Sequence, residues 1–150
     1  MLDPTAVLLV HAGATWFMTG LIWFVQVVHY PLFGRVAEDG FVAYENAHTR
    51  LTTWVVGPPM LLEVGTLAWL SWTPTPAAGG LALGVGAALL ALIWISTALL
   101  QVPRHQELST GFDGRAHRRL VTSNWVRTVA WSLRAALVLW MVAAEIGVGR

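Results

Sequence analysis

Four stretches of the chain are each long and apolar enough to cross a lipid bilayer, and this feature constrains the fold most strongly. A membrane-spanning helix needs about 20 mostly apolar residues. The four candidate spans are residues 5–30, 51–72, 80–102 and 120–146. Short connecting segments make consecutive helices antiparallel neighbours. The sequence therefore predicts an all-α integral membrane protein, an up-down-up-down four-helix bundle that forms a single domain over residues 1–150.

The composition excludes several classes of protein. Hydrophobic residues make up 56% of the chain and charged residues only 11%, whereas a soluble domain carries about 25% charged residues. The absence of Cys excludes disulfides and Cys-based metal centres. A net charge of +1 provides no strong basic field, so no nucleic-acid partner is expected. The expected surroundings are a lipid bilayer.

The arginines are distributed unevenly between the connecting segments. The turn at residues 73–79 carries none, whereas the other two connections carry Arg35, Arg50, Arg104, Arg115, Arg118 and Arg119. Positively charged loops stay in the cytoplasm. We therefore expect a multi-pass protein of the cell (inner) membrane, with the first and third connections in the cytoplasm and both termini outside it.

Polar side chains follow one face of each predicted helix, because residues three, four and seven apart lie on the same side. The ionisable and amide positions are His11, Gln26 and His29 in the first span, His48 and Glu63 in or beside the second, Gln101 and His105 in or beside the third, and Asn124, Arg127 and Arg134 in the fourth. Such groups are costly toward lipid and should face the interior. They predict a polar core or a water-lined cavity, or simply hydrogen bonds that hold the helices together.

Glu63 lies in the middle of an apolar helix and needs a partner, because an unpaired buried charge is expensive. The helical rise places Arg134 and His11 at comparable depth. We expect Glu63 to face the interior and to pair with one of them. This group of buried ionisable residues has an alternative interpretation as an ion pair that fixes helix register.

Three histidines from three helices are expected to converge at the cytoplasmic ends: His29, His48 and His105. Glu45 stands three residues before His48, a spacing that puts a carboxylate and an imidazole on one helix face. These four side chains are therefore candidate metal ligands. The cofactor stays open between a transition metal, a haem and none, since histidines also serve as acid–base groups or merely cap helix ends.

Further polar residues surround this cluster. Gln26, Tyr30 and Gln101 are candidate cofactor-binding residues at the same level. Asn124 and Arg127 are expected to bind oxygen or a developing oxyanion, because preorganised donors stabilise charge as it forms. The predicted catalytic set is thus His29, His48, His105, Asn124 and Arg127.

Short motifs at the ends of all four spans carry a family resemblance. They are His29-Tyr30-Pro31-Leu32-Phe33, His48 with Pro58-Pro59-Met60, Val102-Pro103-Arg104-His105, and Asn124-Trp125-Val126-Arg127-Thr128. In this layout the chain resembles the anthrone-oxygenase-like family of small four-helix membrane proteins, although His105 stands where an Asn is more usual. The resemblance implies oxygenation of an aromatic, polyketide-like substrate and allows a reaction without a bound cofactor.

Together these features favour a membrane oxidoreductase of oxygenase type. Its substrate would be a lipophilic aromatic or quinone-like molecule that reaches the histidine cluster from the bilayer. Two alternatives stay open. One is a non-catalytic accessory or structural subunit of a larger membrane complex, with other subunits or further copies of the chain as partners. The other is a proton or small-solute pathway along the polar faces.

Overall fold

The structure is a computed structural model that describes residues 2–76 and 78–148. Within these residues it contains four long helical rods and no strand. The elements are α1 (Pro4–Phe24), η1 (Val25–His29), α2 (Tyr30–Leu32) and η2 (Phe33–Arg35) in the first rod, α3 (Glu38–Trp72) in the second, α4 (Gly80–Ser96), η3 (Thr97–Gln101) and α5 (Val102–Leu108) in the third, and α6 (Gly114–Val148) in the fourth. The all-α prediction is confirmed.

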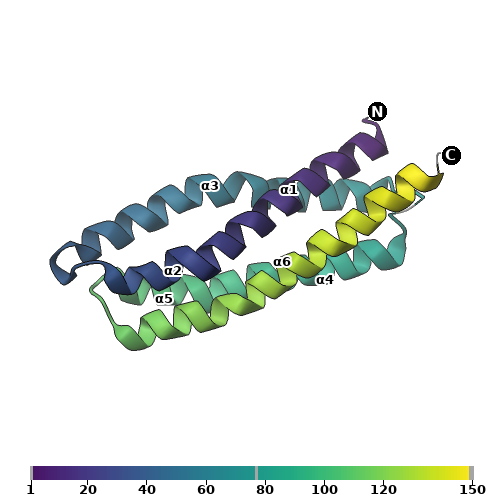
Figure 1. Cartoon of the computed structure of the whole chain (residues 1–150). Helices are drawn as coiled ribbons and strands as arrows, with labels where there is room; N and C mark the ends of the chain where they lie inside the picture. The colour runs from purple at the N-terminus through teal and green to yellow at the C-terminus, as the bar shows by residue number, and fades with distance from the viewer. Residues whose placement is uncertain (1, 77, 149–150) are drawn as a thin grey trace.

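The four rods form an antiparallel bundle (Figure 1). Helix α1 packs against both α3 and α6, and α4 packs mainly against α6. The contact between α3 and α4 is much smaller, so the bundle is loosest on that side. The start of α1 and the end of α6 lie at one end of the bundle, and the connections after the first and third rods lie at the other.

Local sequence signals explain where two of the helices begin. The Asp3 carboxylate accepts a hydrogen bond from the backbone N–H of Thr5 at 3.2 Å, and Pro4 follows at the first helical position. Asp113 accepts from the N–H groups of Arg115 and Ala116, both at 2.7 Å. These bonds lower the pKa of the exposed Asp113 carboxyl. Each carboxylate satisfies N–H groups that have no partner within the helix.

Three of the rods are long and apolar enough to cross a membrane: residues 4–35, 80–108 and 114–147. The second rod is long enough at 35 residues but less apolar, because Pro58, Pro59 and Glu63 interrupt its hydrophobic sequence. The fourth span therefore stays a prediction. Two tryptophans of this rod nevertheless point outward, since Trp54 is 76% and Trp72 is 89% exposed.

The bundle is apolar outside and partly polar inside, which is the distribution expected in a bilayer. Large hydrophobic side chains are exposed along all four rods, whereas His11, Glu63, Asn124, Arg127 and Arg134 are buried. The apolar outer faces indicate a lipid bilayer as the surroundings. The predicted orientation, with both termini outside the cytoplasm, stays a prediction, and Met1 and Arg150 lie outside the described residues.

Candidate functional site

Two π-helical turns shape the site, and each stands immediately before a short helix that carries a proline. The turn Val25–His29 precedes Pro31, and the turn Thr97–Gln101 precedes Pro103. Proline has no backbone N–H, so the usual helical hydrogen bond is lost at these positions. A π-turn accommodates one extra residue and is frequent at functional sites. Here it redirects the side chains that follow it on the first and third rods.

The three imidazoles converge as expected. His29 Nε2 lies 2.8 Å from His48 Nδ1, and the two ring centroids are 4.7 Å apart. The centroids of His48 and His105 are 5.2 Å apart. Burial, reinforced by the neighbouring His105 and His29, lowers the pKa of His48 to about 3. His48 is therefore neutral at physiological pH and serves as a hydrogen-bonding group.

A carboxylate, an imidazole and a phenol form a hydrogen-bonded chain at the centre of the cluster. Glu45 Oε1 lies 2.5 Å from His105 Nδ1, and the Tyr30 hydroxyl lies 2.9 Å from His105 Nε2. In the tautomer in which Nδ1 donates to the Glu45 carboxylate, Nε2 accepts the hydrogen bond that Tyr30 donates. This order is that of a carboxylate–histidine–hydroxyl triad, in which the imidazole can take the hydroxyl proton.

The same contacts bear on the predicted metal site. Among residues 2–76 and 78–148, no group of three or more His, Cys, Asp or Glu side chains has an arrangement that could hold a metal ion. The nitrogens of His29 and His48 face each other at hydrogen-bond distance, and His105 uses both of its nitrogens on Glu45 and Tyr30. Ligation by His29, His48, His105 and Glu45 gains no support from this geometry and stays a prediction.

Asn124 and Gln26 lie behind the site and use their amides on protein groups. Asn124 Nδ2 donates to Gln26 Oε1 at 3.0 Å, and Gln26 Nε2 donates to the Val121 carbonyl at 3.1 Å. Arg127 Nη1 donates to Asn124 Oδ1 at 3.2 Å. Asn124 therefore positions the Arg127 guanidinium, and neither amide lines the cavity described next.

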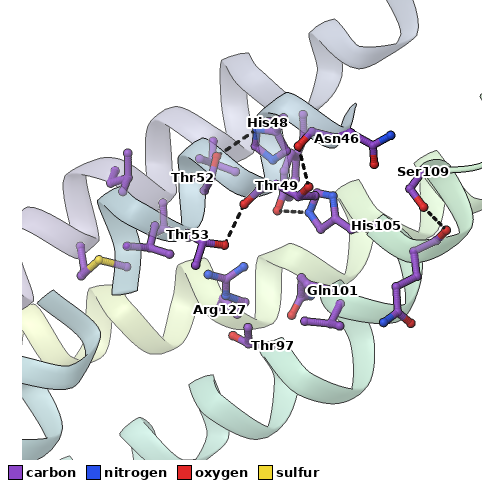
Figure 2. Close-up of a pocket in the computed structure, with 18 residues that line it drawn as sticks. Asn46, His48, Thr49, Thr52, Thr53, Thr97, Gln101, His105, Ser109 and Arg127 are labelled. Atoms are coloured by element: carbon purple, nitrogen blue, oxygen red, sulfur yellow. Dashed lines mark hydrogen bonds between the residues drawn. The ribbon is translucent and has the colours of Figure 1, made fainter. Parts of the chain in front are cut away.

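A cavity of about 410 Å³ lies between α3 and the η3–α5 segment, with walls from α1 and α6 (Figure 2). Figure 2 shows Thr49 and Thr53 on one side, Thr97 and Gln101 on the other, and Arg127 reaching between them from α6. The polar lining includes Tyr30, His48, Gln101, His105 and Arg127, and the apolar lining comprises Met18, Leu21, Ile22, Val25, Val56 and Val102. The cavity thus combines a polar end with an apolar remainder.

The structure divides the predicted site residues into groups. Tyr30, His48, Gln101, His105 and Arg127 line the cavity. His29 and Glu45 contact two of these residues from behind, through the hydrogen bonds to His48 and His105. The sequence did not reveal His117, whose Nε2 donates to the Tyr30 carbonyl at 2.7 Å. No spacing rule links positions so far apart in the chain.

The buried ionisable residues form a second cluster, closer to the chain ends. Arg134 donates to Glu63, and His11 Nε2 lies 3.6 Å from Glu63 Oε2. Thr15 also donates to Glu63, and the Arg134 guanidinium reaches the Gly86 carbonyl. Of the two predicted partners, Arg134 forms the hydrogen-bonded ion pair with Glu63, and His11 lies beside the carboxylate and contacts Arg134 Nη2 at 3.2 Å. This cluster does not line the cavity. Its contacts link all four rods, because His11 lies on α1, Glu63 on α3, Gly86 on α4 and Arg134 on α6.

The comparisons with known proteins assign the chain to no family. No protein-family model matches the chain, and no curated protein and no solved structure shows significant similarity to it. The resemblance to the anthrone-oxygenase-like family therefore stays a prediction. Any function has to be argued from the cavity and its residues.

Proposed function

We propose that the protein is a membrane oxidoreductase of oxygenase type that binds a lipophilic aromatic, phenol-like or quinone-like molecule in the cavity. The observation that carries this proposal is the Glu45–His105–Tyr30 chain, whose phenol end opens into a largely apolar cavity. Apolar cavities of several hundred Å³ with a few convergent polar groups are typical of small-molecule sites.

The chain provides a defined proton-transfer step. A ligand hydroxyl at the polar end gives its proton to the Tyr30 oxygen, while Tyr30 passes its own proton to His105 Nε2. The buried Glu45 carboxylate stabilises the resulting imidazolium through the 2.5 Å contact with Nδ1. One proton leaves the ligand, and the ligand becomes an electron-rich oxyanion. An oxygenase reaction then requires molecular oxygen as the oxidant of this anion.

The side on which the cavity opens is consistent with a ligand from the bilayer. Helix α3 and the third rod make only a small contact, and the cavity lies between them. Its lining includes exposed side chains of both, among them Thr53 and Val102. A lipophilic molecule could therefore move between the lipid and the cavity without crossing the charged ends of the bundle.

The test measures oxygen consumption by the purified protein in nanodiscs. The probe is anthrone, whose enol tautomer is a phenol. We expect Tyr30→Phe and His105→Ala to lower the rate about 100-fold or more, which is the usual contribution of acid–base catalysis. Tyr44→Phe is the matched control, because Tyr44 does not line the cavity. Full activity in both site variants would refute the proposal. Absence of activity together with co-purification of a larger complex would favour the accessory-subunit alternative.

A further inference from the structure

Arg127 is a buried cation without an anionic partner among the described residues. Arg127 is only 6% exposed, and it forms no ion pair within residues 2–76 and 78–148. Its neighbour on the same helix, Arg134, pairs with Glu63. Arg104, on α5, pairs with Glu107. Arg127 differs from both in having only neutral partners.

The neutral partners leave part of the guanidinium unused. Arg127 Nη1 donates to Asn124 Oδ1, and the guanidinium also interacts with the Tyr30 hydroxyl. Its Nε is buried and has no hydrogen-bond partner among the described residues. A buried charge is expensive unless it is paired, and an unpaired one inside a membrane bundle is a functional candidate.

The position of Arg127 directs its unpaired guanidinium toward the cavity. The residue lines the cavity together with Tyr30 and Gln101, and Figure 2 shows its guanidinium directed from α6 into the space between α3 and η3. Val25, Ile22 and other apolar side chains continue the wall on one side. A ligand with an ionised oxygen and an apolar body would place the oxygen on Arg127 and bury the body against that wall.

We propose that Arg127 makes the cavity selective for lipophilic organic acids bound as anions, such as phenolates, enolates or aromatic carboxylates. This inference rests on the proposed function in so far as it assumes that the cavity binds a ligand. It goes beyond that function by specifying that the bound ligand is an anion. The apolar wall excludes a small inorganic anion as the preferred occupant, because such an ion would leave the wall without contacts. Arg127 then binds the oxyanion that the Tyr30–His105 pair produces.

The test compares two probes of equal size, 2-naphthoate and the neutral 2-naphthamide, by isothermal titration calorimetry on the purified protein in detergent at neutral pH. Wild-type protein is expected to bind the carboxylate at least 10-fold more tightly. Arg127→Gln should weaken naphthoate binding by roughly 10- to 100-fold, the worth of a charge-assisted hydrogen bond, and should leave naphthamide unchanged. Arg127→Lys should restore part of the preference, and Arg104→Gln is the control.

The outcomes separate this inference from the function on which it rests. Equal binding of both probes by the wild type, or an unchanged preference in Arg127→Gln, would overturn the anion selectivity and leave the cavity as a ligand site. Binding of neither probe would overturn both. If Arg127→Gln does not fold, the wild-type comparison still decides whether the cavity prefers an anion, and Arg127→Lys together with Arg104→Gln decides which arginine is responsible. Loss of naphthoate binding in Arg104→Gln would also count against Arg127, since it would assign the selectivity to the charge of the bundle end.

Discussion

Replacing Arg134 by Met removes the cation from the buried cluster and leaves Glu63 behind. Glu63 is fully buried and would keep only the bond from Thr15 and the approach of His11 at 3.6 Å. The Gly86 carbonyl would also lose its donor. Breaking a buried ion pair by removing one partner costs about 3–5 kcal/mol. We expect Arg134→Met to lower the free energy of unfolding by about this amount.

The surface pair between Arg104 and Glu107 supplies the matched control. Its side chains are 25% and 47% exposed, and exposed pairs of this kind contribute at most about 1 kcal/mol. Arg104→Met should therefore have a small effect. The assay is equilibrium unfolding in mixed detergent micelles, followed by helical circular dichroism. The double variant Arg134→Met with Glu63→Gln removes both charges and should recover much of the loss.

Two results would refute this reasoning. If Arg134→Met costs no more than Arg104→Met, the pair is not buried in the way the structure shows. If the double variant is as unstable as Arg134→Met, the cost does not come from the uncompensated Glu63 carboxylate. The lost Gly86 hydrogen bond and the cavity left by the shorter side chain would then explain it.

Three further predictions concern pH, helix capping and topology. The pKa of His48 is lowered from 6.5 to about 3 in the folded protein, so between these pH values the unfolded chain binds a proton that the folded protein does not. The contribution of His48 to the free energy of unfolding should therefore be fully present above pH 6.5 and be lost as the pH falls toward 3. Chemical unfolding at several pH values should show a smaller pH slope in His48→Gln. Asp113→Ala removes the acceptor for the Arg115 and Ala116 N–H groups, so its thermal midpoint should fall below that of Asp39→Ala. Single cysteines are informative because the chain has none: in intact cells an impermeant maleimide should label Pro76→Cys but not Thr110→Cys, and the reverse pattern would invert the predicted orientation.

Much of the fold follows from the sequence, because a membrane imposes simple rules on a chain. Long apolar stretches and a Pro- and Gly-containing turn at residues 73–80 predict the number and order of the helices. The period of the polar side chains predicts which face of each helix is buried, and the pairing of Glu63 with Arg134 follows from helical rise and the cost of an unpaired charge. These are local or one-dimensional properties, so one sequence suffices to determine them.

The partners within the site were decided only by the tertiary structure. The sequence predicts that His29, His48 and His105 meet, but it does not show that His105 joins Glu45 to Tyr30, residues 60 and 75 positions away. It also suggested Asn124 and Arg127 as a pair acting on the ligand, whereas Asn124 lies behind Arg127 and positions it. Hydrogen-bond partners depend on side-chain direction to within about an ångström. Here the two π-turns and the packing of four separate helices set that direction, and no spacing in the sequence encodes it.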